Sequence, residues 1–329
     1  MNVLIVCHAG SKVGLGHLTR SLAVARIVRQ ALDVSIRFLI QGDPIAHPEL
    51  QQFEHSFLSI GEDLTKMIGR QLDTSVPQVI IFDLFPGWLP IDLAKLLKNL
   101  RAKACKIIAV DGLLSYQDHL DLIVMPSFRC PPEVVESQGA PVIYGWDCFL
   151  LNAKADPRLW CRGNHVLVLS GGADVKGLGQ RLPRLLLDTL PHNTQVNWVT
   201  GPYARQPDFP ESSTITFNNH QAPSSLDELM LDAHYAVTVY GVSFFELLYF
   251  GIPTVVFSPY GNKDDDELGL IAKENIALVA RDELDALEKL RNLMADDEMA
   301  SELSIAAQKK MAAAANGGRI VQVLNELMA

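Results

Sequence analysis

The sequence has few cysteines and lacks the motifs that mark several common classes of protein. Among its 329 residues there is no CxxC pair and no His/Cys set at zinc-ligand spacing. There is also no Walker loop and no serine-centred nucleophile elbow. The cysteines are scattered, several within apolar runs, which is typical of reduced cytosolic thiols: Cys7, Cys105, Cys130, Cys148 and Cys161.

Basic blocks and long hydrophobic runs are also missing. Lys and Arg number 28 against 38 Asp and Glu, and the formal net charge of −10 argues against a nucleic-acid partner. The first apolar run, residues 2–7, is too short for a signal peptide or a membrane helix, and no basic region precedes it. We therefore expect a cytoplasmic protein without an integral membrane segment.

The length and the 48% hydrophobic content suggest two domains, each with its own core. In the first half, apolar β-like runs alternate with helical patterns, which predicts a parallel sheet covered on both faces. The expected strands are residues 3–7, 35–40, 79–82, 106–110 and 122–125, and the expected helices are 17–32, 63–72 and 90–100.

The alternation breaks at residues 151–163, which are polar and contain proline, and then begins again. The second series of expected strands is 166–169, 195–199, 214–217, 235–239, 254–257 and 277–279. Asp296 is expected to cap a helix that runs to about Ala315, and Asn316-Gly317-Gly318 to stop it. The pattern predicts an α/β protein with two Rossmann-like domains facing across a cleft, 1–155 and 156–318, and a C-terminal helix, 319–329, that returns to the first domain.

The first strand leads into a glycine turn that carries a histidine. Gly14, Gly16 and His17 stand where strand gives way to helix, followed by Arg20. Glycines there let a ligand approach the backbone, and the helix start favours anions. A histidine at this place suggests a reacting hydroxyl or water, although an exposed histidine near the start of the helix would fit the same pattern.

Two aspartates follow later strands of the same predicted sheet. Asp83 and Asp111 each close a strand, and ligands of such sheets bind beyond the carboxyl ends of the strands. We expect both side chains to lie in the same crevice as His17. The alternative for each aspartate is a helix or turn cap.

The second half has two further glycine turns after strands. Gly171-Gly172 is a weak phosphate-loop signal, and Gly241 with Ser243 opens a helix. Glu246 lies about one turn into that helix, where a carboxylate can accept hydrogen bonds from a ribose diol. Ser243 and Glu246 also have the spacing of a capping box, and both roles can hold.

The acidic run Asp264-Asp265-Asp266-Glu267 contains the D-x-D spacing of metal-dependent glycosyl transfer. It also precedes an apolar helix, where acidic residues complement the helix dipole. We prefer the second interpretation and predict no metal and no cofactor.

Three of these segments together resemble the glycosyltransferase-B (GT-B) superfamily: the opening through Arg20, Gly171-Gly172-Ala173-Asp174, and the block 241–253. More narrowly, they resemble the branch that contains the UDP-sugar hydrolase of pseudaminic acid synthesis and the spore-coat polysaccharide (SpsG-like) proteins. The segment 144–151 is similar to the part of that branch before its interdomain linker. The likeness spans most of the chain in order and spacing.

The resemblance implies roles for several residues. His17 matches the histidine taken as general base in the hydrolase, and Asp83 matches its strand-ending aspartate. Glu246 matches the ribose-binding acid, and the pyrophosphate-facing turns match Gly171, Gly172, Gly241, Val242, Ser243 and Phe244.

The departures from the family pattern fall on the sugar-recognising side. Val6 and His8 stand where the hydrolase has an arginine and an aspartate, and Leu84-Phe85 replaces its His-Tyr. Near the sugar, Asn262-Lys263 and the acidic run replace an Asn-Gln pair. Because lost polar contacts change specificity by large factors, the hydrolase activity does not carry over directly.

The resemblance favours an inverting UDP-sugar-dependent glycosyltransferase of bacterial glycan or polysaccharide biosynthesis. His17 and Asp83 are the candidate catalytic residues, and a cation such as Arg20 or Lys176 would stabilise the diphosphate. The expected partners are a UDP-sugar and a small-molecule or glycan acceptor. Two alternatives stay open: a UDP-sugar hydrolase of the pseudaminic or nonulosonic acid type, and a non-catalytic nucleotide-sugar-binding subunit. A dinucleotide-dependent oxidoreductase is the last alternative, because the first turn lacks the GxGxxG spacing of such enzymes.

Overall fold

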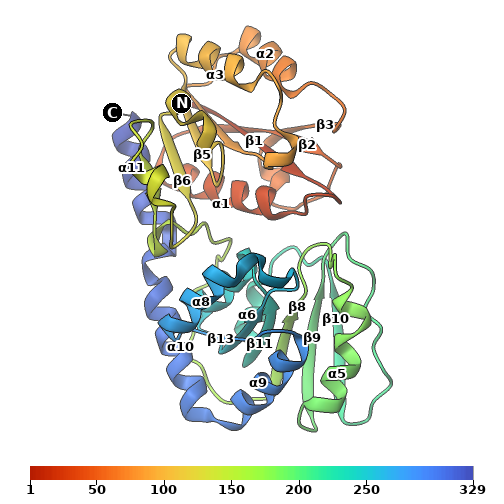
Figure 1. Ribbon diagram of the computed structural model, residues 1–329. Coiled ribbons are helices and arrows are strands. Elements are labelled where there is room, and N and C mark those ends of the chain that lie inside the picture. Colours follow the sequence, from red (N-terminus) through yellow and green to blue (C-terminus); the bar gives the residue numbers. More distant parts are fainter. Residues whose placement is uncertain (329) are drawn as a thin grey trace. The chain divides into compact units, whose positions relative to one another are not determined.

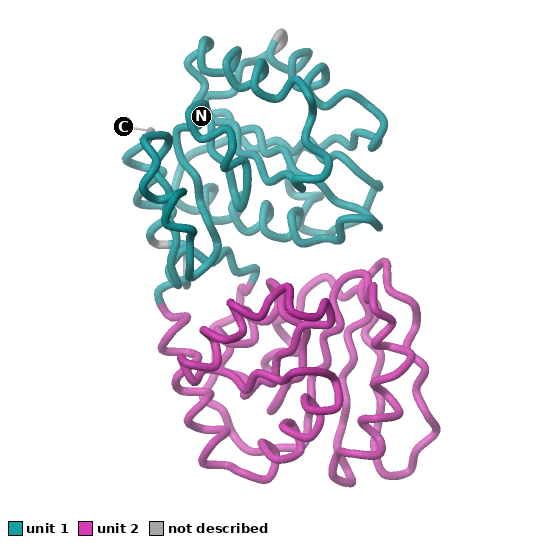
Figure 2. Tube along the Cα trace, viewed as in Figure 1, with its two compact units in different colours: residues 1–152, 313–329 teal, residues 153–312 magenta. Residues whose placement is uncertain are grey.

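The computed structural model describes residues 1–328, so the last residue of the expected C-terminal segment, Ala329, lies outside the described residues. The chain divides into two compact units (Figure 2). Residues 1–152 together with 313–329 form unit 1, and residues 153–312 form unit 2. No helix among the described residues is long and apolar enough to cross a membrane.

Unit 1 is built on a seven-stranded sheet in which every neighbouring pair is parallel. The spatial order is β3-β2-β1-β4-β5-β6-β7. The strands are β1 (Asn2–Ala9), β2 (Ser35–Gly42), β3 (Glu54–Leu58), β4 (Val79–Asp83), β5 (Lys106–Val110), β6 (Leu122–Met125) and β7 (Val142–Tyr144). The helices are α1 (Gly16–Ala31), α2 (Leu64–Thr74), α3 (Leu93–Ala102), α4 (Pro132–Val135) and α11 (Gly318–Met328).

Alternate residues of β1 serve two separate cores, one on each face of the unit 1 sheet. Val3 and Ile5 pack with α1 and with Ile320 and Leu324 of α11. Leu4 and its neighbours on the other face pack with α2 and α3, which Figure 1 shows together on that face. This double burial explains why the strands read as continuous apolar runs.

Unit 2 repeats the arrangement with six parallel strands in the order β10-β9-β8-β11-β12-β13. They are β8 (His165–Leu169), β9 (Thr194–Thr200), β10 (Ile215–Gln221), β11 (Tyr235–Val239), β12 (Thr254–Phe257) and β13 (Leu278–Val279). The helices are α5 (Leu182–Thr189), α6 (Asp227–Asp232), α7 (Val242–Phe250), α8 (Asp265–Glu274), α9 (Glu283–Ala295) and α10 (Asp297–Met311). The predicted α/β class with two Rossmann-like sheets is confirmed.

The end of α10 differs in detail from the prediction. Asp296 caps the helix as expected, since its carboxylate accepts from the Met299 amide at 2.9 Å. The α-helix ends at Met311, and a 3-10 stretch over 312–317 follows, as is frequent at helix ends. Gly317 has φ +61, and a Cβ there would lie 2.7 Å from Ile27 of α1, so the turn requires glycine.

Candidate active site

In each sheet the strand order reverses at one point, and the candidate residues of each unit lie at that point. In unit 1 the switch lies between β1 and β4, and in unit 2 between β8 and β11. Loops that leave the carboxyl ends of two such strands part to opposite sides, which leaves a crevice for a ligand. His17 and Asp83 belong to the first switch point, and Gly171 and Gly241 to the second.

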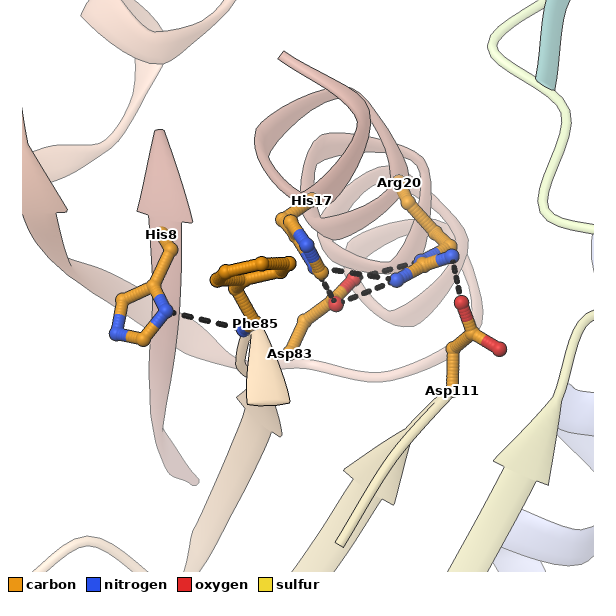
Figure 3. Close-up of polar contacts among 6 residues, drawn as sticks. All are labelled: His8, His17, Arg20, Asp83, Phe85 and Asp111. Carbon is orange, nitrogen blue, oxygen red and sulfur yellow. Dashed lines mark hydrogen bonds and ion pairs between the residues drawn. The ribbon is translucent and has the colours of Figure 1, made fainter. Parts of the chain in front are cut away.

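His17 and Asp83 are in direct contact in unit 1. The Nδ1 atom of His17, the second residue of α1, lies 2.6 Å from Oδ1 of Asp83, the last residue of β4. Figure 3 shows both side chains meeting beyond the strand end. Asp83 is only 1% exposed, whereas His17 is partly exposed. The expectation that this aspartate faces the histidine is thus met by a hydrogen bond.

Arg20 holds the same carboxylate from one turn further along α1. Its Nε donates to Asp83 Oδ2 at 2.7 Å and its Nη2 to Oδ1 at 2.6 Å, a two-point contact of the kind that fixes a carboxylate firmly. Its Nη1 donates to Asp111, which follows β5 with φ +52. Arg20 is therefore buried between two carboxylates, and its expected role as a cation for the diphosphate stays a prediction.

The contacts of Asp83 decide its charge. Burial alone would raise the pKa of this carboxyl group, but the guanidinium of Arg20 and the hydrogen bonds from Arg20 and His17 outweigh burial and hold the pKa below its usual value. Asp83 is therefore a carboxylate and can only accept hydrogen bonds. A proton on His17 Nδ1 donates this hydrogen bond, so in the neutral imidazole Nε2 is the nitrogen that carries the lone pair. Arg20 Nη2 lies 3.3 Å from the same Nδ1, further than the carboxylate.

The glycine turn before α1 closes on itself. The amide of Gly14 donates to Gly10 O at 2.7 Å, and the amide of Gly10 donates back to Gly14 O at 3.1 Å. Gly14 has φ +75, so glycine is required there, and Gly16 is the first residue of α1. Because these amides bond to each other, the turn positions His17, and Gly10 and Gly14 do not offer their N–H groups to a phosphate.

An aromatic loop lies beside His17. The ring of Phe85 meets the His17 ring edge-on at 6.3 Å, and its backbone amide donates to His8 Nδ1 at 3.0 Å (Figure 3). Burial, with His17 close by, lowers the pKa of His8 to about 4, so His8 is neutral and its Nδ1 accepts this bond. Of the three residues at the positions where the resembled hydrolase has polar groups, His8 and Leu84 are buried, and the Phe85 ring is partly exposed beside His17.

In unit 2 the turn after β8 is tightly packed. Gly171 has φ +90, and the space that a Cβ on Gly201 would need is filled by the backbone of Gly172. The Ser170 hydroxyl is buried beside this turn and has no hydrogen-bond partner within residues 1–328. Asp174 accepts from the amides of Leu178 and Gly179, both at 2.8 Å. The loop 170–174 therefore has a fixed backbone with one hydroxyl left to bond.

Helix α7 begins at the second switch point. Its N-cap is Gly241, no side chain caps it, and its first turn contains no acidic residue. Val242, Ser243 and Phe244 are its first three residues, so Ser243 lies inside the helix and is not its N-cap. The capping-box alternative for Ser243 and Glu246 is therefore wrong. Glu246 follows as the fifth residue and is 6% exposed.

The segment after β12 carries the expected sugar-side residues and the acidic run. Asn262 and Lys263 lie exposed in a 3-10 turn, and Lys263 Nζ is 5.4 Å from the centre of the Tyr260 ring. Lys176 Nζ lies 5.7 Å from the same ring. Asp264 accepts from the Ser258 hydroxyl at 2.6 Å, while Asp265, Asp266 and Glu267 form the first turn of α8, as the dipole interpretation predicts. Within the described part of the chain, no group of three or more His, Cys, Asp or Glu could hold a metal ion.

The two doubly wound sheets and their glycine turns define the GT-B fold of glycosyltransferases. Solved structures with this arrangement match nearly the whole chain, at identities that show the fold alone. Phytolacca americana UGT2, complexed with UDP-2fluoro-glucose and pterostilbene, has a TM-score of 0.67 and 11% identity, with 100% of both chains covered. Acinetobacter baumannii MurG has a TM-score of 0.62 and 13% identity, covering 99% of this chain and 100% of its own.

A third structure, the spinosyn rhamnosyltransferase SpnG complexed with thymidine diphosphate, has a TM-score of 0.61 and 13% identity, again covering 99% of this chain and 100% of its own. No protein-family model matches the chain. No curated protein matches its sequence. The GT-B fold is therefore established, whereas membership of the superfamily and of the branch of pseudaminic and spore-coat proteins stays a prediction.

Proposed function

We propose that the chain is an inverting glycosyltransferase that uses a UDP-linked sugar, in the synthesis of a bacterial glycan or polysaccharide. The observation that carries this proposal is the contact between His17 Nδ1 and Asp83. It leaves His17 Nε2 as an available base next to a carboxylate that stabilises the imidazolium once formed.

The nucleotide belongs to unit 2 in this proposal. The start of α7 offers uncapped backbone N–H groups and the positive end of the helix dipole, which suit a diphosphate. The turn at Gly171-Gly172 and the Ser170 hydroxyl add donors on the neighbouring strand. With Arg20 in contact with two carboxylates, Lys176 is the other candidate cation for the leaving group, and Glu246 is assigned to the ribose.

The proposed reaction is a single displacement at the anomeric carbon. His17 Nε2 takes the proton of an acceptor hydroxyl, whose oxygen forms a bond to the anomeric carbon. The bond from that carbon to the diphosphate oxygen breaks, and UDP leaves with the electron pair. Attack from the side opposite the leaving group inverts the anomeric centre.

The test is release of UDP from a panel of UDP-sugars, with and without candidate acceptors, by wild type and His17→Ala. Acceptor-dependent release that the variant loses supports the transferase. Release at an enzymatic rate in plain buffer would instead identify a hydrolase with the same base. If no UDP-sugar is consumed, the proposal fails and a non-catalytic binding subunit remains.

A further inference from the structure

Unit 1 contains a pocket of about 370 Å³ outside the groups that hold His17. It is formed by the end of β2, the loop that leads from β3 into α2, and the loop between β4 and α3. All of its lining residues fall within 41–92, so the pocket is complete within unit 1. A volume of this size accommodates a small molecule of two or three rings.

One wall of the pocket is apolar. Trp88, Pro90 and Ile91 come from the loop after β4, and the pocket is also lined by Ile60 from the loop after β3 and by Leu64 at the start of α2. Ile91 is fully exposed and Ile60 is 40% exposed, both against the usual burial of isoleucine. Apolar side chains gathered around a hollow are typical of a ligand site.

The other side of the pocket is held in place by buried polar contacts. Gln41, the buried penultimate residue of β2, donates from Nε2 to Glu62 O at 2.9 Å and so fixes the loop before α2. The Trp88 ring packs on the buried His8 ring at 5.2 Å. Because both loops are tied to strands of the sheet, the pocket is formed before a ligand arrives.

Phe85 connects this pocket to the proposed base. Its ring contacts the His17 ring at 6.3 Å and the Trp88 ring at 6.0 Å, edge-on in both cases. The ring lies over Gly87, where a Cβ would be only 2.6 Å from Phe85 Cε1. Phe85 therefore lies between Trp88, which lines the pocket, and the His17 ring.

The rim of the pocket is acidic. Glu62, Asp63 and Asp92 line it, and there is no Lys, Arg or His among the described residues of the lining. Glu62 accepts from the Ser59 amide at 2.8 Å and Asp63 from the Lys66 amide at 3.1 Å, so these carboxylates are fixed near the opening. Like charges repel, and this rim disfavours a carboxylate, sulfate or phosphate on the ligand.

We propose that this pocket binds the body of the acceptor, and that the acceptor is a hydroxylated molecule with a flat apolar ring system and no negative charge. The assignment rests on the proposed transferase function.

The test uses three fluorescent probes of one shape: naphthol, its cationic aminomethyl derivative and the anionic hydroxynaphthoic acid. Binding to the full chain is followed by fluorescence titration without any nucleotide sugar. We expect saturable binding of naphthol and of the cationic probe, and binding about tenfold or more weaker for the anionic probe.

Ile91→Asp is the pocket variant and Ile305→Asp its matched control, because Ile305 is also an exposed isoleucine, on α10 of unit 2. Ile91→Asp should weaken naphthol binding about tenfold, and Ile305→Asp should leave it unchanged. Equal binding by the two variants, or equal binding of the anionic probe, overturns the pocket assignment.

The same variants separate this inference from the proposed function. Acceptor-dependent UDP release that Ile91→Asp leaves intact would overturn the acceptor pocket and leave the transferase standing. Pocket-dependent naphthol binding in a protein that consumes no UDP-sugar would overturn both the transferase and the acceptor role of the pocket.

Discussion

His17 is fixed through Nδ1, and this contact determines which of its nitrogens can react. Replacing it with alanine or asparagine removes the proposed base at Nε2, while the proposed nucleotide site of unit 2 keeps all of its residues. We expect kcat to fall by about 10²–10⁴, the usual contribution of general-base catalysis, with UDP affinity nearly unchanged. Steady-state kinetics, UDP titration and melting temperature, measured on one variant, check this expectation.

A purely structural histidine would give the opposite pattern for the same variant. The melting temperature would fall, while turnover and its pH profile would stay as in wild type. Turnover within about threefold of the parent, less than base catalysis normally contributes, would contradict the proposed mechanism.

Asp83 links the site to acid stability. Its pKa is held below the ordinary value in the folded chain, chiefly because Arg20 outweighs the effect of burial. An unfolded aspartate titrates near 3.9, so the stability that Asp83 supplies is fully present above about pH 4 and is lost as the pH falls through the lower, folded pKa. Asp83→Asn should lower the melting temperature at neutral pH and flatten its fall in acid.

The comparison for this prediction is Asp43→Asn, because the pKa of Asp43 is also lowered, by hydrogen bonds from Ser11, but at an exposed loop. Melting temperatures measured from about pH 7 to about pH 3 should change little with Asp43→Asn. If the melting temperature falls equally with decreasing pH in Asp83→Asn and in wild type, the carboxylate of Asp83 contributes no stability.

Residue-scale chemistry was only partly predictable from the sequence. His17 and Asp83 could be paired because each stands at the end of an element that a parallel sheet brings to one edge. The contacts of Arg20 could not be predicted, since a basic residue one turn along α1 could bind either a phosphate or a carboxylate. Only the positions of Asp83 and Asp111 around its guanidinium decide between the two.

At the scale of elements, α7 offers a test of nucleotide binding. The helix begins at Val242 with no capping side chain, and Glu246 lies further along it, nearly buried. Glu246→Ala should weaken UDP binding about ten- to hundredfold, because a charge-assisted hydrogen bond to the ribose contributes roughly 1.5–3 kcal/mol. Calorimetric titration with UDP measures the effect.

Ser243→Ala tests the capping alternative for this helix. Because Ser243 is inside α7, the variant should not lose stability through capping. An unchanged dissociation constant for UDP in Glu246→Ala, together with a lower melting temperature, would leave Glu246 with a structural role only.

Strands were predictable where burial on both faces leaves continuous apolar runs. β5, β6, β11 and β12 have the predicted bounds. Strands β3 and β7 were missed, because Glu54–Leu58 is mostly exposed next to β2 at one edge, and Val142–Tyr144 is only three residues long at the other. Such edge strands form because they pair with a neighbouring strand, and the residue pattern of the segment itself carries no information on that pairing.

At the scale of the whole molecule, the two sheets repeat one strand order, so each unit places a glycine turn after its first strand and a second feature after its fourth. In unit 1 the second feature is Asp83, and in unit 2 it is the start of α7. This repeat is visible in the sequence as two series of alternating strands and helices. The pocket beside Phe85 is not, because it depends on how two loops meet.

The net charge of −10 does not by itself imply that the protein needs a bound metal cation. The acidic residues 264–267 have structural roles within their own segment. Asp264 accepts from Ser258, and the next three acids lie at the start of α8, where the helix dipole favours negative charge. We therefore expect UDP release to continue at full rate in EDTA, and Asp266→Asn to retain it. Activity that is lost in EDTA and returns only with magnesium or manganese would identify the run as a metal site. A monovalent salt at equal ionic strength is the control, because an effect of charge screening alone would be the same with either salt.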